Sequence, residues 1–200
     1  MIFKNTRGPE SQSNLEKRLQ SLEQQAEIAL PGFDAQFFNQ AGDLCVEVGE
    51  SQRALNYYGR AIDAYLRAGR YNAAGAVCRK LIRISPGAVR TRCTLAWLSI
   101  GKGLLGDAER EVNEYVAAAV AAGQEDLARK QVRMMAEATR NEELRALLAE
   151  HLRDLDAPEV AERILAEDPG EDPDREEAEA LWSRVLRAAL MGPEDLRGED

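Results

Sequence analysis

A single histidine limits the acid–base and nucleophilic chemistry that this sequence can carry. His151 stands between Glu150 and Leu152, and its neighbours supply neither a nucleophile nor a group that would orient the ring. A Ser-His-Asp or Cys-His site needs its histidine hydrogen-bonded to both kinds of group. We interpret His151 as an exposed helix residue, and we expect no catalytic residues and no enzyme activity.

Metal and cofactor chemistry also lacks its usual residue patterns. Cys45, Cys78 and Cys93 form no C-x-x-C pair, and one histidine cannot complete a zinc-ligand spacing with them. Adjacent carboxylates such as Glu142-Glu143 point about 100° apart on a helix, so they cannot flank a substrate. We expect no metal and no cofactor, and we interpret the cysteines as reduced core thiols of a cytoplasmic protein.

Residues 101–106 read G-K-G-L-L-G, which is a literal G-x-G-x-x-G. In a dinucleotide-binding fold such glycines follow a strand, and a second strand ends in an acid about 20 residues further on. Here the stretch from Glu114 to Gly123 is rich in alanine and helical in pattern, and no βαβ pattern occurs elsewhere. The segment is therefore predicted to be a turn between helices.

Charge is distributed unevenly along the chain, whose net charge is −9. The stretch 64–106 has eight Lys or Arg and no Asp or Glu, whereas 141–200 has 19 acids against seven arginines. The acidic average argues against nucleic acid as the partner. Three interpretations of the basic stretch stay open: a solvated helix face, a groove for an acidic peptide, or a surface covered by the acidic tail. The groove would use these partner-binding residues: Asn56, Arg67, Arg90, Trp97 and Arg133.

The elements that would position these residues are helices throughout. Apolar residues recur at helical spacing along most of the chain, and breaks fall near residues 49, 69, 86, 103, 123 and 140. Alternating strand patterns are almost absent. The breaks are 17 to 20 residues apart, so each helix with its turn takes that length. Two such helices form a unit of roughly 34 to 40 residues, which is typical of helical repeats.

Composition and helical periodicity divide the chain into five parts. We expect a loose N-terminus over 1–13, an N-terminal helix over 14–30 and a helical repeat domain over 34–167. An acidic linker over 168–175 and a C-terminal helix with an acidic tail over 176–200 follow. The last helix either caps the array or is presented to a partner's groove. No stretch is a secretory signal or a membrane span, which indicates a cytoplasmic protein.

Three stretches, beginning at Ala35, Leu55 and Val89, resemble the tetratricopeptide repeat family. A unit beginning at Ala35 matches its pattern at Phe38, Ala41-Gly42, Ala54, Tyr58 and Ala61. A unit beginning at Leu55 matches it at Tyr58, Ala61, Tyr65, Gly69, Ala74 and Pro86. A unit beginning at Val89 matches it at Leu95-Ala96, Ala108 and Val112. The first two registers overlap, so the helix over 51–68 fits either role and the hairpin pairing stays open.

The resemblance implies an all-α, right-handed superhelix of antiparallel helix pairs with seven to nine helices. It also implies a non-enzymatic protein–protein interaction module, such as an adaptor, co-chaperone or assembly factor, whose concave groove holds a partner peptide or helix. Asn39, Asn56 and Arg90 lie near the family's carboxylate-clamp positions without completing the set. Two alternatives remain: an RNA-binding helical repeat that uses 64–106, and a self-assembling structural subunit.

Overall fold

The computed structural model describes residues 9–30 and 32–168, and every regular element in these ranges is an α-helix. The chain divides into two compact units: the first ends at Ile84, and the second begins at Ser85. The described helices are α1 (Pro9–Ile28), α2 (Asp34–Glu47), α3 (Ser51–Arg67), α4 (Tyr71–Ile84), α5 (Val89–Gly101), α6 (Leu105–Ala121), α7 (Glu125–Ala138), α8 (Glu142–Asp154) and α9 (Pro158–Ala166). The prediction of an all-α fold built from paired helices is confirmed.

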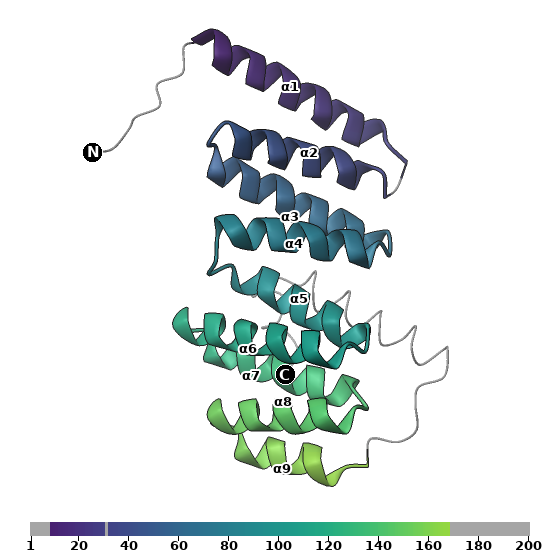
Figure 1. Ribbon diagram of the computed structural model, residues 1–200, viewed down its shortest axis with the longest axis vertical. Helices are drawn as coiled ribbons and strands as arrows, with labels where there is room; N and C mark the ends of the chain where they lie inside the picture. The colour runs from purple at the N-terminus through teal and green to yellow at the C-terminus, as the bar shows by residue number, and fades with distance from the viewer. Residues whose placement is uncertain (1–8, 31, 169–200) are drawn as a thin grey trace, which may run out of the picture. The chain divides into compact units, whose positions relative to one another are not determined.

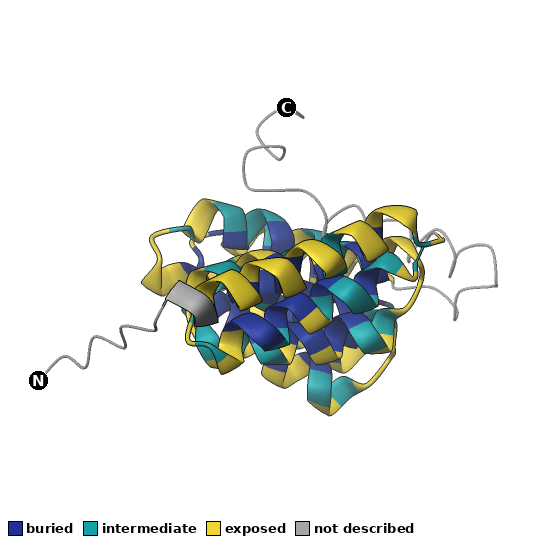
Figure 2. Ribbon diagram, turned by 90° about the horizontal axis from the view of Figure 1, so that it is seen from above, coloured by how far each residue is buried: buried dark blue, intermediate teal, exposed yellow. Residues whose placement is uncertain are grey.

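The first unit consists of α1 to α4, each packed against the next (Figure 1). Short loops join them, so neighbouring helices run in opposite directions. Buried residues face their neighbours and exposed residues face outward along each helix (Figure 2). The amphipathic spacing of the sequence accounts for this division, because residues three and four apart share one side of a helix.

The most extensive packing in this unit is between α2 and α3. A Cβ atom added to Gly42 would lie 2.5 Å from the Tyr58 ring, so only glycine lets the two helices meet at this depth. Gly42 and Tyr58 are both matching positions of the register beginning at Ala35. Their contact supports the pairing of α2 with α3 in one hairpin.

Four of the described helices end in the same hydrogen-bonded cap, three of them at a glycine and α8 at Asp156. Gly49 has φ +78°, its N–H donates to Val46 O, and the N–H of Glu50 donates to Cys45 O. Gly69, after α3, and Gly123, after α6, repeat these two bonds. This arrangement satisfies carbonyl groups that the helix end leaves free, and glycine takes the left-handed conformation without steric cost. Gly103, inside the G-x-G-x-x-G stretch, also has positive φ, at +65°, and lies in the turn between α5 and α6.

The second unit consists of α5 to α9, which again pack in sequence, with further contacts from α6 to α8 and from α7 to α9. Its core contains a cluster of polar side chains around Gln131, which is buried. The indole N–H of Trp97 donates to Gln131 Oε1 at 2.8 Å, and Cys93 Sγ lies 3.7 Å from the same oxygen. Burial raises the pKa of the Cys93 thiol to about 12, so this cysteine stays protonated.

Two of the expected boundaries fall differently or lie outside the described residues. The first helix begins at Pro9 instead of at residue 14. Polar residues can form the first turn of a helix. Pro9 suits the first helical position, because a backbone N–H there would have no partner within the helix. The linker after residue 168 and the predicted helix and tail over 176–200 lie outside the described residues.

Candidate partner-binding surface

The five residues predicted to bind a partner lie on three helices in two units. Asn56 and Arg67 are exposed on α3 of the first unit. They are 11 residues apart, which is about three helical turns and roughly 16 Å, so they share one face of α3. Arg90 on α5 and Arg133 on α7 are exposed in the second unit, where Arg133 lies 3.8 Å from Glu137.

Trp97 does not lie at the surface, and the prediction that it contacts a partner is wrong for this conformation. Its side chain is 1% exposed and packs in the core of the second unit with its N–H bonded to Gln131. Nine of the thirteen residues of α5 are buried. A helix that is apolar on all sides gives no periodicity from which an outward-facing tryptophan could be told from a core residue.

The most exposed large apolar side chains gather around the loop that joins α1 to α2. Ile28, Leu30 and Phe33 are 85%, 71% and 52% exposed, and we call these three residues the loop cluster. Single exposed apolar residues are common, but a contiguous group is typical of an interaction site. In the sequence this stretch lies between the predicted helix over 14–30 and the repeat domain predicted from residue 34, at Pro31-Gly32, and no binding role was predicted for it. Ile28 and Leu30 precede Pro31-Gly32 and Phe33 follows it, and these large apolar residues beside a turn were the sequence signal for an exposed cluster.

Several contacts fix the backbone that carries the loop cluster. The N–H of Phe33 donates to Leu30 O at 2.9 Å, and the N–H of Gly32 donates to Asp34 Oδ1 at 3.1 Å. Arg70 donates to Gly32 O at 3.4 Å, and its guanidinium lies 5.7 Å from the centre of the Phe33 ring. These contacts hold the backbone at Leu30, Gly32 and Phe33, beside the exposed side chains.

Gly32 is held against the end of α3. A Cβ at this position would lie 2.6 Å from the Ala68 Cβ, and its φ of +86° also suits glycine. This close approach places the loop next to the residues that follow Arg67. The apolar cluster and two exposed arginines, Arg67 and Arg70, thus lie around one end of the first unit.

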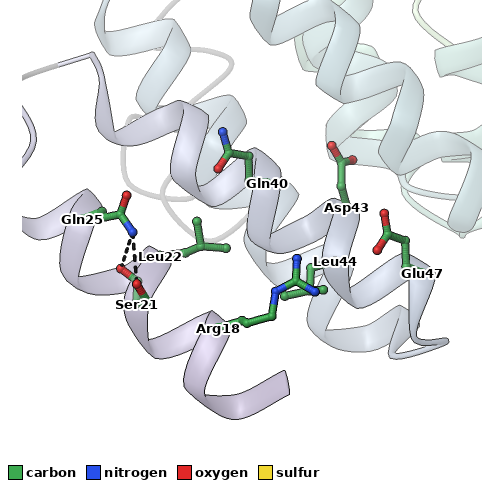
Figure 3. A pocket seen from close by; sticks show the side chains of 8 residues that line it. All are labelled: Arg18, Ser21, Leu22, Gln25, Gln40, Asp43, Leu44 and Glu47. Atoms are coloured by element: carbon green, nitrogen blue, oxygen red, sulfur yellow. Dashed lines mark hydrogen bonds between the residues drawn. The ribbon is translucent and has the colours of Figure 1, made fainter. Parts of the chain in front are cut away.

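A groove of about 400 Å³ opens between α1 and α2 (Figure 3). Leu22 and Leu44 form its apolar part, and polar side chains form the rest. Four lining residues come from each helix: Arg18, Ser21, Leu22 and Gln25 from α1, and Gln40, Asp43, Leu44 and Glu47 from α2. Residues 18, 21, 25 and 28 are three or four apart, so Ile28 of the loop cluster continues the same face of α1.

Some polar side chains of the groove already have hydrogen-bond partners within the chain, and others do not. Gln25 Nε2 donates to the carbonyl and hydroxyl oxygens of Ser21, both at 3.1 Å (Figure 3). Arg18, Gln40 and Glu47 make no side-chain hydrogen bond or ion pair with any residue of the described ranges. Their polar atoms are therefore open to another molecule.

Asp43 belongs to the groove wall but is fully engaged within the first unit. Lys80 of α4 donates to both its carboxylate oxygens at 2.7 and 2.8 Å, and the hydroxyl of Tyr58 donates to Oδ1 at 2.6 Å. Lys80 also donates to Asn39 at 3.0 Å. Burial, together with the carboxylate of Asp43, raises the pKa of Tyr58. This network joins α2, α3 and α4, and it neutralises the charge of Asp43.

The groups considered for catalysis occupy structural positions. His151 is half-buried instead of exposed, and its Nε2 lies 2.6 Å from Asn113 Oδ1, which can only accept. Burial lowers the pKa of His151, and the carboxylates of Asp154 and Glu150 oppose this shift. All three cysteines are buried free thiols. Within the described ranges no three potential metal-ligating side chains come together, and no helix has the length and apolar character of a membrane span.

No family model matches the chain. No curated protein matches it either. Among solved structures, the chain is similar to a tetratricopeptide repeat protein from Parabacteroides merdae, at 16% sequence identity and a TM-score of 0.25, over 91% of this chain and 80% of that one. The all-α assignment rests on the helices of this chain, because a likeness at this TM-score adds no weight to it.

Proposed function

We propose that this chain is a non-enzymatic module that binds another protein through its first unit. The loop cluster carries the proposal: Ile28, Leu30 and Phe33 are exposed, and hydrogen bonds hold the backbone at Leu30, Gly32 and Phe33. Burial of apolar surface is the dominant favourable term in most protein–protein association, and a backbone that is already held by hydrogen bonds loses less conformational entropy on binding. An adaptor, co-chaperone or assembly factor would use such a surface.

The charges around the loop cluster suggest the kind of surface that it meets. Arg67 and Arg70 are exposed beside it, and acidic groups on a partner would pair with them. This proposal retains two arginine positions of the basic stretch and moves the binding site from a single basic groove to one end of the first unit. Arg90 and Arg133 remain proposed contacts of the second unit.

Affinity capture from native lysate tests the proposal when it is run with paired variants. Leu30→Ser/Phe33→Ser removes two members of the loop cluster, and Leu104→Ser/Val120→Ser removes two comparably exposed apolar side chains of the second unit. We expect a protein partner that the wild-type and control chains retain and the loop variant loses. A set of captured proteins that does not depend on the loop cluster would contradict the proposal.

An RNA-binding repeat remains the second candidate, because the helix α4 carries Arg79, Lys80 and Arg83 and no acid. Phosphate contacts release counterions, so such binding must weaken steeply with salt. Fluorescence anisotropy with a labelled single-stranded RNA, titrated over salt concentration, separates the two functions. Tight, strongly salt-dependent binding that Arg83→Glu, a change at an exposed residue of α4, abolishes would favour RNA.

Self-assembly is the third candidate, and it predicts a mass that increases with concentration in light scattering. If Leu30→Ser/Phe33→Ser returned that mass to the monomer value, a second copy of the chain would be the occupant of the loop cluster. We expect a mass near the 22.1 kDa of one chain at every concentration.

A further inference from the structure

The groove between α1 and α2 is a second surface of the first unit, and its chemistry differs from that of the loop cluster. It combines a small apolar area, formed by Leu22 and Leu44, with side-chain amides on both walls (Figure 3). We infer that it binds an extended peptide segment of a partner protein. One apolar side chain of that segment lies on the two leucines, and Gln25 and Gln40 hydrogen-bond its backbone.

The two glutamines favour an extended chain over a helix. A helix pairs its own backbone N–H and C=O groups, so it offers amide side chains almost nothing to bond along its length. An extended segment carries an unpaired donor and acceptor at every residue, and a side-chain amide has the matching acceptor and donors. Recognition through the backbone also tolerates many partner sequences.

The existing hydrogen bonds assign a role to each glutamine. Gln25 is held by its two bonds from Nε2 to Ser21, which leaves Oε1 to accept a peptide N–H. Gln40, on the opposite wall, has no described partner and can donate to a peptide carbonyl. The glutamine on α1 is thus fixed before binding, and the glutamine on α2 turns to meet the peptide.

The charges of the groove select against a strongly acidic or strongly basic segment. Arg18 and Glu47 stand on opposite walls near one end and have no described partner, and Asp43 is neutralised by Lys80. An acidic run would meet Glu47 and a basic run would meet Arg18 without compensation. We therefore assign to the groove a neutral segment, or one whose acidic and basic residues face Arg18 and Glu47 respectively.

The volume limits how much of the peptide the groove holds. About 400 Å³ lies at the small end of the range for binding pockets, so it accommodates a few residues with one apolar anchor. Ile28, which continues the α1 face, lies beyond Gln25 in the direction of the loop cluster. A partner that binds the loop cluster could thus extend a terminal or looped segment into the groove.

Nuclear magnetic resonance of the full chain tests the inference with defined probes. The parent probe is a capped heptapeptide with one central leucine among serines and glycines. A second probe has N-methylated amides on both sides of the leucine, and a third replaces the leucine by serine. A fourth probe is a helix-stapled peptide with leucine at its centre. Side-chain amide signals of Gln25 and Gln40 and methyl signals of Leu22 and Leu44 are followed during titration.

We expect the parent probe to shift these four sets of signals and to saturate at millimolar concentration. N-methylation, or Gln40→Leu in the chain, should weaken binding about fivefold, which is the scale of one neutral hydrogen bond. Gln20→Leu, on the exposed side of α1, is the matched control and should leave the affinity unchanged. Unshifted signals, equal binding of the N-methylated probe, or equal binding of the stapled helix would each overturn the inference.

The inference rests on the proposed function because it assumes a protein partner, but the two fail separately. Loss of peptide binding with Gln40→Leu and retention of a partner that depends on the loop cluster would overturn only the groove. Peptide binding in the groove without any partner that depends on the loop cluster would overturn only the proposed function.

Discussion

Gly42 sets how closely α2 and α3 can pack, and it offers the sharpest test at the scale of one residue. In Gly42→Ala the new methyl group would lie 2.5 Å from the Tyr58 ring, which is buried and cannot move away freely. We expect a loss of about 1–3 kcal/mol in the free energy of unfolding. Gly59→Ala on α3 meets nothing within 4 Å and should raise it by about 0.5–1 kcal/mol. Urea denaturation measures both, and a neutral Gly42→Ala would contradict the close packing.

Asp43 is expected to stabilise the first unit through the hydroxyl of Tyr58 more than through its charge. The pair with Lys80 is partly exposed, so it contributes little. Asp43→Ala, however, leaves the buried Tyr58 hydroxyl without its acceptor, which costs about 1–3 kcal/mol.

A double-mutant cycle measures this contribution directly. In a Tyr58→Phe background the hydroxyl is already absent, so Asp43→Ala should cost clearly less than it does in the wild-type chain. Equal costs in both backgrounds would show that the hydroxyl bond to Asp43 contributes nothing measurable.

His151 predicts a specific dependence of stability on pH. Burial lowers the pKa of the folded-state imidazole below its usual value of 6.5, with Asn113 accepting from Nε2 and Asp154 and Glu150 opposing the shift. The unfolded chain therefore takes up this proton first as the pH falls. The contribution of His151 is fully present above about pH 6.5 and is lost as the pH falls from there toward the folded-state pKa.

The comparison with His151→Gln isolates this contribution from that of the carboxylates. Between pH 7.5 and 5.5 the wild-type chain should lose more unfolding free energy than the variant does, as measured by denaturant titration. Identical losses would mean that His151 titrates alike in the folded and unfolded chains.

At the scale of elements, α9 depends on one buried cation from α8. Arg145 is buried and donates to the carbonyl oxygens of Ala136 at the end of α7 and of Ile164 and Glu167 at the end of α9. A cation at these helix ends satisfies free carbonyls and complements the helix dipoles.

Arg145→Met should therefore lower the unfolding free energy by about 2–3 kcal/mol, because it removes charged donors from buried acceptors. Amide hydrogen exchange should become faster in α9 than in α5. Arg163→Met, which removes only exposed ion pairs at 3.9 and 4.0 Å, should stay within about 0.5 kcal/mol of the wild-type chain. Unchanged exchange in α9 of Arg145→Met would contradict the capping role.

The elements could be predicted because glycine and helix periodicity mark them locally. Breaks expected near residues 49, 69, 103 and 123 coincide with glycines of positive φ, and the contact of Gly42 with Tyr58 agrees with the first repeat register. The sequence could not place Trp97 or His151, because their burial depends on neighbours from α7 and α6 that are far away along the chain. Local periodicity carries no information about such contacts.

At the scale of the whole molecule, the candidate surface was harder to predict than the fold. The basic stretch 64–106 predicted that arginines bind the partner, whereas in the structure the most exposed large side chains are the apolar residues of the loop cluster, on both sides of Pro31-Gly32. The exposure of Ile28 and Leu30 depends on where α1 ends relative to α3, which only the packing of the unit determines. The groove between α1 and α2 depends in the same way on two helices meeting.

The dissociation constant of the first captured protein partner tests the central claim most directly. Isothermal titration calorimetry would compare the wild-type chain, Leu30→Ser/Phe33→Ser and Leu104→Ser/Val120→Ser. Because interface anchors each contribute more than about 1 kcal/mol, the loop variant should bind at least about tenfold more weakly, and the control should match the wild-type chain. Equal affinity for all three chains would contradict a protein-binding function of the loop cluster.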